Sequence, residues 1–198
     1  MAPRVRAICG SGESKVSADL IARLPALEVI SIMGVGYDGV DVAAAKARGV
    51  MVGHTPDVLN DDVADLALGL MLSAARQLPA ADRFVRGGQW LLGNQPLARK
   101  MSGARLGLVG IGRIGQAIAQ RALAFNMSVA YTARSARPAL PYAYHRDLVS
   151  LAAAVDFLVV ITPGGAATRH MVNAQVLKAL GPQGILVNVA REIGRAHV

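Results

Sequence analysis

The residues whose types and spacing best predict chemistry form one short run, Gly110-Ile111-Gly112-Arg113-Ile114-Gly115. The run follows an apolar stretch, residues 105–109, and precedes an amphipathic one, residues 114–125, so we expect a strand before it and a helix after it. In such a loop the first glycine permits a tight turn, the second lets the backbone approach a pyrophosphate, and the third lets the helix pack closely on the strand. The helix N-terminus adds amides and a positive dipole end. The pattern predicts a dinucleotide site that includes Gly110, Gly112, Arg113, Ile114 and Gly115, although an ordinary glycine-rich turn would use the same residues.

The residues after the next apolar run, 128–132, bear on which dinucleotide binds. Domains that bind NAD usually place an Asp or Glu there, about twenty residues after the glycines, to bond the ribose hydroxyls. This chain has Ala133 instead, followed by Arg134 and Ser135. A carboxylate would repel a 2′-phosphate, whereas Arg134 can pair with it and Ser135 can donate a hydrogen bond. The sequence therefore favours NADP(H) over NAD(H), the alternative being that Arg134 only solvates a loop.

Around this loop, short apolar runs alternate with amphipathic segments, which is typical of a parallel α/β sheet. We expect strands at residues 5–9, 28–32, 50–53, 105–109, 128–132, 156–161 and 185–189. We expect helices at residues 17–24, 41–48, 60–77, 114–125, 148–154 and 173–180, with a further helix that ends near residue 86. The stretch 93–96, which contains Gly and Pro, is the best domain boundary, giving one domain at 1–95 and a second at 96–191.

The composition excludes several classes of protein. The 198 residues are 53% hydrophobic and 17% charged, with a mean hydropathy of +0.39, so a disordered tail or a coiled coil is ruled out. The unbroken apolar runs are well below the roughly 18–20 residues of a membrane helix, and the first residues lack an apolar signal-peptide core. The single cysteine, Cys9, excludes an intramolecular disulfide and a paired-cysteine metal site. We expect a cytoplasmic globular protein with no metal centre and no membrane partner.

The charge is divided unevenly along the chain. Residues 83–198 contain fourteen Lys and Arg but three Asp and Glu, whereas residues 1–82 contain seven and ten. A basic half is typical of a protein that binds an anionic ligand, although a GC-rich genome would also enrich arginine. The arginines are scattered singly and aromatic residues make up 4% of the chain, so we expect no nucleic acid partner.

Four motifs spread along the chain together resemble one family. They are Gly34-Val35-Gly36-Tyr37-Asp38, Asp62-Val63-Ala64-Asp65, the loop 110–115, and Asn188-Val189-Ala190-Arg191. The chain resembles the D-isomer-specific 2-hydroxyacid dehydrogenases, particularly the glyoxylate/hydroxypyruvate reductase-like members. The resemblance implies an α/β fold, a Rossmann-type doubly wound parallel sheet that is incomplete here and is preceded by a partial flavodoxin-like substrate domain. It also implies hydride transfer between NADP(H) and a small 2-oxo or 2-hydroxy acid, by a homodimer when the protein is intact.

The resemblance assigns roles to particular residues. The backbone amides around Val35 and Gly36 would hold the substrate carboxylate. Arg191 would be the catalytic residue, binding carboxylate and carbonyl oxygens and polarising the ketone. Further cofactor contacts are implied at the ends of two later strands and in the loop between them, at Ile161, Thr162, Pro163, Thr168, Val189 and Ala190.

The resemblance also implies features that are missing from this sequence. The family's proton donor is a His paired with a Glu, both well downstream of the catalytic arginine. His54, His145, His170 and His197 do not match that position. His54 follows an expected strand and could be a cleft residue, but we interpret it as a solvated turn residue. The family's chain extends further at both ends, so we expect a fragment that is inactive by itself. Residues 192–198 read like translated sequencing-adapter DNA, which predicts a non-native tail.

Two other functions stay open at this point. One is an NAD-dependent formate, phosphoglycerate or phosphonate dehydrogenase of the same superfamily, against which the Ala133-Arg134 pair counts. The other is a non-enzymatic, corepressor-like module that keeps the 110–115 loop for a dinucleotide but binds protein partners.

Overall fold

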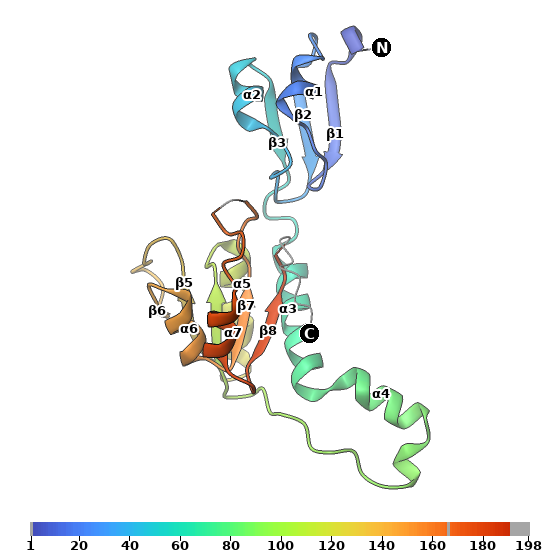
Figure 1. The fold of residues 1–198 in the computed structure, drawn as a ribbon, viewed down its shortest axis with the longest axis vertical. Helices are drawn as coiled ribbons and strands as arrows, with labels where there is room; N and C mark the ends of the chain where they lie inside the picture. The colour runs from blue at the N-terminus through green and yellow to red at the C-terminus, as the bar shows by residue number, and fades with distance from the viewer. Residues whose placement is uncertain (1, 166, 191–198) are drawn as a thin grey trace. The chain divides into compact units, whose positions relative to one another are not determined.

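The computed structural model describes residues 2–165 and 167–190 (Figure 1). Their contacts divide the chain into two compact units. The first unit comprises the described residues of Met1–Leu59 and Pro163–Ala167, and the second those of Asn60–Thr162 and Thr168–Val198. This division falls directly before a long helix, whereas a boundary near residue 95 between the domains of the whole protein stays a prediction.

The first unit is built on a small parallel sheet. Its strands, in spatial order, are β1 (Ala7–Ser11), β2 (Val29–Met33) and β3 (Met51–His54). The intervening helices are α1 (Ala18–Ala22) and α2 (Val42–Ala47), and a short 3-10 helix, Ala2–Arg4, precedes β1. Each α-helix begins at a side chain that caps its first turn, Ser17 for α1 and Asp41 for α2. Because all three strands run parallel, the loops that follow them leave from one edge of the sheet.

The second unit contains a larger parallel sheet. Its strands are β4 (Arg105–Val109), β5 (Ser128–Thr132), β6 (Ala143–Tyr144), β7 (Phe157–Val160) and β8 (Ile185–Asn188). Their spatial order is β6-β5-β4-β7-β8, so successive strands extend the sheet first to one side of β4 and then to the other. The loops after β4 and β7 therefore diverge, and a crevice for a ligand forms where this reversal occurs.

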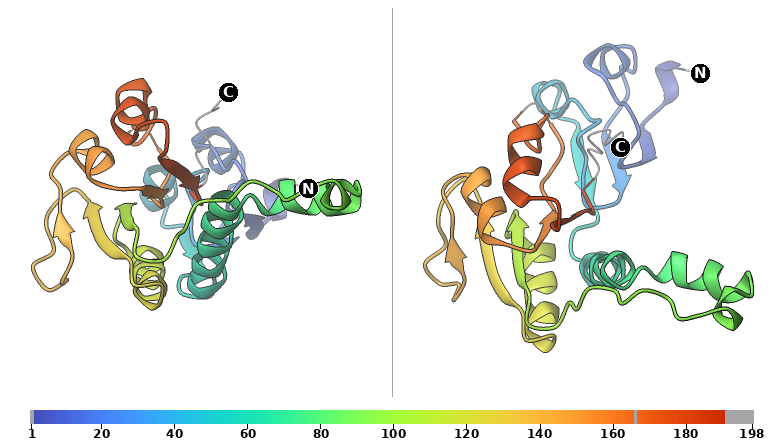
Figure 2. Two further views of the ribbon diagram at one scale, coloured as in Figure 1. Left: turned by 90° about the horizontal axis from the view of Figure 1, so that it is seen from below. Right: turned by 60° about the horizontal axis from the view of Figure 1, so that its bottom comes forward.

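Helices cover both faces of this sheet. Figure 2 shows α5 (Arg113–Ala124) on one face and α6 (Leu148–Ala154) with α7 (Ala174–Leu180) on the other. The side chains of β4 alternate accordingly, since Leu106 and Leu108 pack in the core with α5, and Val109 packs in the core with α6 and α7. The helix α3 (Asn60–Arg76) joins α5 in the first of these cores. The second unit is thus a three-layer α/β fold of the Rossmann type, as the sequence predicts.

An arm, residues 78–98, projects from the second unit. It begins where Gln77 adopts a left-handed conformation (φ 54°) between α3 and α4 (Leu78–Arg86), and it continues through a 3-10 helix, Gln89–Leu91. Figure 1 shows α4 and the returning chain extending away from the sheet. Large apolar side chains on the arm are exposed, including Trp90 at 57% and Leu92 at 91%. Such exposure on a projecting element is typical of a surface that another chain covers.

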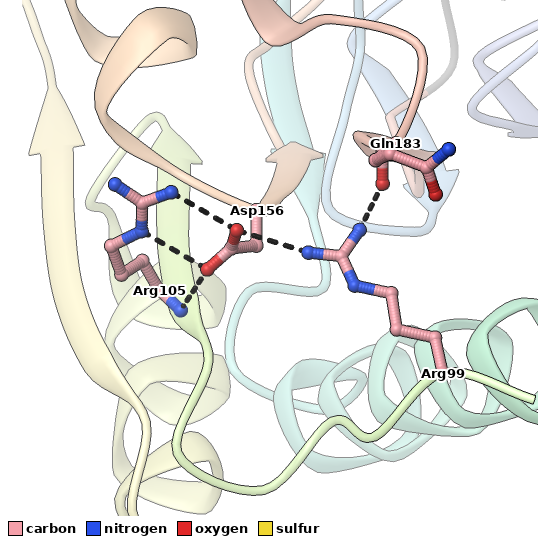
Figure 3. A network of polar contacts seen from close by, with 4 residues as sticks. All are labelled: Arg99, Arg105, Asp156 and Gln183. Carbon is pink, nitrogen blue, oxygen red and sulfur yellow. Dashed lines mark hydrogen bonds and ion pairs between the residues drawn. The ribbon is translucent and has the colours of Figure 1, made fainter.

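The end of the arm is fixed by Asp156, which precedes β7 (Figure 3). The guanidinium of Arg99 pairs with its Oδ1 at 3.0 Å and also donates to the carbonyl of Gln183. Arg105, at the start of β4, donates to the same carboxylate through its backbone N–H (2.9 Å) and its side chain (3.1 Å). These bonds, chiefly those from the Arg105 side chain, lower the pKa of Asp156 to about 2. One carboxylate therefore joins the arm to two central strands.

The expected elements agree with the structure within two residues at each end, and β4, β5 and α6 match without a shift. The short strand β6 was not expected, because two residues carry no periodic pattern and their pairing with β5 defines them. Within the described residues, no helix is both long and apolar enough to cross a membrane.

Candidate functional site

The glycine loop after β4 has the geometry that its spacing predicts. Gly110 has a φ of 103°, and a Cβ on it would lie 2.5 Å from the carbonyl oxygen of Ile161. A Cβ on Gly115 would lie 2.6 Å from the carbonyl oxygen of Gly110. Both glycines are therefore required for the close approach of β4, β7 and the start of α5.

Gly112 differs from its two neighbours in the motif. It is exposed, its φ is −74°, and among the described residues other than its neighbours along the chain no atom lies within 4 Å of the position that a Cβ would take. It is the N-cap of α5, and no described side chain caps that helix. The amides of the first turn can thus be approached by a phosphate group. These residues fit a dinucleotide pyrophosphate.

Arg113 and Ile114 open α5 with different surroundings. Arg113 is exposed, whereas the Ile114 side chain packs against the core of the second unit. The side chain of Ile114 is therefore a packing group, and a contribution to cofactor binding would come from its backbone.

The end of β5 carries the three residues that bear on cofactor choice. Ala133 is half-buried, and its carbonyl accepts a hydrogen bond from the Tyr144 hydroxyl at 3.3 Å. Arg134 and Ser135 are exposed. The Arg134 guanidinium has no ion pair or hydrogen bond with any residue of 2–165 or 167–190. A guanidinium and a hydroxyl accordingly stand together at the end of the strand that follows the glycine loop.

The residues expected after β7 and β8 lie at the same edge of the sheet. Ile161 donates to the carbonyl of Val109 at 2.9 Å, and Val189 donates to that of Val160 at 3.1 Å. Ala190 follows, with its amide donating to the Asn188 side chain at 2.9 Å. The carboxyl ends of β4, β7 and β8 are thus held side by side.

Thr162, Pro163 and Thr168 lie in the segment that leaves β7. Thr162 contacts the Met171 sulfur through its hydroxyl at 3.7 Å, and the Thr168 carbonyl accepts from the Met171 amide at 3.2 Å. Pro163 is exposed and groups with the first unit.

The expected substrate loop, residues 34–36, follows β2 in the first unit. Gly34 is buried with a φ of 133°, and Val35 and Gly36 are half-buried. The amide of Gly34 donates to the Thr55 hydroxyl at 2.8 Å, and the Thr55 amide donates back to the Gly34 carbonyl at 3.0 Å. His54 contacts the same loop. The sequence did not predict that His54 and Thr55 contact this loop, because no local pattern around them indicates a contact with residues that follow another strand.

The expected catalytic residue, Arg191, and the expected tail, 192–198, lie outside the described residues. Within the described part of the chain, no group of His, Cys, Asp and Glu side chains could hold a metal ion. An acidic pair on α3, Asp61 and Asp65, instead binds Arg121 of α5, at 2.9 Å and 2.5 Å, and raises its pKa. That cluster joins two helices of one layer and is structural.

A parallel sheet with its glycine loop at the point of strand reversal defines a dinucleotide-binding α/β protein, and comparisons with known proteins agree. The sequence profile of the D-isomer specific 2-hydroxyacid dehydrogenase NAD-binding domain matches residues 68–193. Hydroxyphenylpyruvate reductase of Plectranthus scutellarioides is 45% identical over 190 residues, covering 96% of this chain and 61% of that protein. Glyoxylate/hydroxypyruvate reductase A of Arabidopsis thaliana is 45% identical over 187 residues, covering 94% and 60%.

A solved structure is similar in both sequence and fold. It is the NADPH-dependent glyoxylate/hydroxypyruvate reductase of Sinorhizobium meliloti in complex with NADP and malonate, which is 48% identical with a TM-score of 0.88, covering 95% of this chain and 59% of that one. The chain belongs to the D-isomer specific 2-hydroxyacid dehydrogenase family. It spans about 60% of the length of the curated relatives that it matches.

Proposed function

We propose that the whole protein is an oxidoreductase that reduces small 2-oxo acids such as glyoxylate and hydroxypyruvate with NADPH. The whole protein here means a chain of the relatives' full length that contains these residues. Its flanking segments are either the natural ones, encoded beside this sequence, or the corresponding segments of the Sinorhizobium meliloti reductase. The observation that carries the proposal is the site at the carboxyl edge of the second sheet, where the approachable loop at Gly112 and the exposed Arg134 suit a phosphorylated dinucleotide.

The proposed chemistry assigns a task to each group of residues. When bound, NADPH supplies the hydride. The amides of Val35 and Gly36 bind the substrate carboxylate, and Arg191 binds carboxylate and carbonyl oxygens so that negative charge developing on the carbonyl oxygen is stabilised. Ile161, Thr162 and Pro163 line the nicotinamide side, with Val189 and Ala190 at the adjacent strand end. Thr168, in the following loop, is a further cofactor contact. The resemblance places the proton donor downstream of Arg191, so residues 1–198 alone should show no turnover.

Cofactor preference tests the assignment of Arg134. We expect NADPH to be preferred to NADH by about 1–3 kcal/mol, the value of a charge-assisted hydrogen bond. Arg134→Ala should abolish most of that preference and leave the use of NADH nearly unchanged. Arg137→Ala is the matched control, since Arg137 lies in the same loop and bonds the Tyr131 hydroxyl through its backbone N–H and carbonyl. Equal kcat/KM values for the two cofactors in the unmutated protein would refute the preference.

Turnover tests the assignment of Arg191. Arg191→Lys should lower kcat/KM for glyoxylate by about 10²–10³-fold, the usual cost of losing one donor to a developing oxyanion. An ammonium lacks the planar fork that binds two oxygens at once. The Kd for NADPH should stay within a factor of two, roughly 0.4 kcal/mol. Near-normal turnover of glyoxylate by Arg191→Lys would show that Arg191 does not act in the site.

The names of the relatives supply the substrate panel. They include reductases of hydroxyphenylpyruvate, glyoxylate, hydroxypyruvate and 2-ketogluconate, and each of these acids should be assayed with NADPH. A formate dehydrogenase structure is also similar, but at 26% identity against 48% for the Sinorhizobium reductase. Reduction of any panel acid supports the proposal, whereas formate oxidation without such reduction would refute it.

We also propose that the whole protein is a homodimer that buries the arm. The arm has a hollow of about 450 Å³ lined in part by Phe84 and Pro96, and its exposed apolar side chains include Leu92 and Leu97, which are almost fully or fully exposed. A second copy offers the same surface in a self-complementary arrangement. Leu92→Glu should therefore yield monomers in size-exclusion chromatography with light scattering, whereas Val149→Glu, at an exposed position on α6, should leave the dimer intact.

A further inference from the structure

His54 lies at the end of β3, next to the loop that leaves β2. In the sheet it pairs with Ile32, and the chain of β2 continues from there into Gly34 and Val35. Its ring nitrogen Nδ1 is 3.0 Å from the carbonyl oxygen of Val35. A carbonyl oxygen can only accept a hydrogen bond, so Nδ1 carries the proton in this contact.

The ring of His54 is held in place by a second contact from the same loop. The Tyr37 ring meets it edge to face, with ring centres 4.9 Å apart and planes at 62°. Edge-to-face packing is a favourable arrangement for two aromatic rings. The imidazole is therefore held by a hydrogen bond to Val35 and by packing against the Tyr37 ring, so it is not a freely solvated side chain.

The bonds from His54 and Thr55 determine which way two backbone amides of the loop point. No cis peptide bond occurs within the described residues, and in a trans peptide the C=O and the following N–H point in opposite directions. Thr55 N holds the Gly34 carbonyl, which directs the Val35 N–H the other way. His54 holds the Val35 carbonyl, which directs the Gly36 N–H the other way.

We infer that His54 is a positioning residue, which orients the Gly36 amide for the substrate carboxylate. The inference rests on the proposed function, in which the amides of Val35 and Gly36 bind that carboxylate. Thr55 orients the first amide through its backbone, which every residue but proline supplies. The second amide depends on a side chain, so the identity of residue 54 affects how tightly a 2-oxo acid binds.

Steady-state kinetics of the whole protein test the inference. With NADPH saturating, His54→Ala should raise the KM for glyoxylate about 3–10-fold, the value of one hydrogen bond, and change kcat less than about threefold. His54→Asn should restore KM to within about twofold, because its amide nitrogen takes the place of Nδ1. His54→Gln is the matched control, since its amide lies one carbon further out and should behave like Ala.

Two further measurements separate positioning from stability. The Kd for NADPH should be equal in all variants, because the glycine loop 110–115 and Arg134 belong to the second unit. His145→Ala removes another histidine, which bonds Ser150 at 3.0 Å in the second unit, and should leave the KM for glyoxylate unchanged. If His54→Ala fails to fold, the KM values of His54→Asn and His54→Gln for glyoxylate still test the positioning role, because only Asn should keep the KM of the parent.

The outcomes distinguish this inference from the function on which it rests. An unmutated protein that reduces no 2-oxo acid refutes both. An active protein whose KM is the same with His, Ala, Asn and Gln at residue 54 refutes the positioning role alone. A KM that rises with Ala and Gln and returns with Asn supports it.

Discussion

The two glycine loops of this chain, 34–36 and 110–115, occupy equivalent places but are held in different ways. Each follows a parallel strand at its carboxyl end. Loop 110–115 is held by its own backbone and that of β7, because Gly110 and Gly115 pack where a side chain would collide with carbonyl oxygens. Loop 34–36 is held by His54, the last residue of β3, and by Thr55, which follows it.

This difference explains why the loops are not equally visible in a sequence. Exclusion of a Cβ requires glycine at fixed spacing, so loop 110–115 has a recognisable local pattern. Bonds from a neighbouring strand require only that suitable groups meet in space. A pattern of glycines therefore predicts the first kind of loop and its ligand, and the second kind is understood only with the fold.

The strongest test compares two glycines of the same loop. Gly110→Ala should lower the free energy of unfolding of the whole protein by about 3 kcal/mol or more, because it adds a clash to a strained backbone. Gly112→Ala should change stability little, because its φ is ordinary and its surroundings are open. It should weaken NADPH binding at least about tenfold, since the new methyl group occupies the path of the pyrophosphate. Denaturant unfolding and cofactor fluorescence measure the two effects.

The comparison fails if the two substitutions behave alike. A Gly110→Ala protein as stable as the parent would mean that the backbone does not hold this loop. Unchanged NADPH affinity in Gly112→Ala would show that the pyrophosphate does not bind at the N-terminus of α5.

Asp156 tests whether stability and ligand binding are separable in the second unit. Its pKa is lowered to about 2, so the bonds to Arg99 and Arg105 stabilise the fold above pH 4 and are lost as the pH falls toward 2. Asp156→Asn should cost about 2 kcal/mol of unfolding free energy at pH 7, and the difference from the parent should shrink over that window.

Urea unfolding at several pH values measures this effect. NADPH affinity at pH 7 should be unchanged, because Asp156 lies at the amino end of β7, opposite the glycine loop. Glu28→Gln is the control, since its exposed pair with Arg6 belongs to the first unit and should contribute little. A difference between Asp156→Asn and the parent that is the same at pH 2 and pH 7 would contradict the assignment.

The smallest effect concerns the bond that closes loop 34–36. Thr55→Val leaves the buried Gly34 amide without its acceptor and should cost about 1–2 kcal/mol. Thr55→Ser keeps the hydroxyl and should cost less than half of that. A rise in the KM for glyoxylate with Val but not with Ser would show that the Thr55 hydroxyl, like His54, positions loop 34–36 for the substrate. Equal stability of both variants would show that this bond is dispensable.

Much of the fold could be predicted because its signals are local. The strands β4 and β7 are apolar runs between turn residues, and Asp147 and Asn173 cap helices within their own segments. β6 could not be predicted, because it exists only through its pairing with β5.

The candidate site divides in the same way. The spacing of Gly110, Gly112 and Gly115 predicts a dinucleotide loop, and Ala133 with Arg134 predicts a preference for NADP(H). The contact of His54 with Val35 joins residues that are 19 positions apart, so no local pattern contains it. The interpretation of His54 as a solvated turn residue is right about its exposure but wrong about its place, since His54 is the last residue of β3 and bonds Val35.

The strand order of the second sheet also affects how the chain folds as it leaves the ribosome. The first unit pairs β1, β2 and β3 in the order of their synthesis. In the second unit β4 can pair with β5 at once, but its other edge waits for β7, whose Phe157 pairs with Leu106. Until then one edge of an apolar strand stays open, and non-local pairing of this kind is slow. A chaperone that binds extended apolar segments would meet the nascent chain at β4, before β7 has been made.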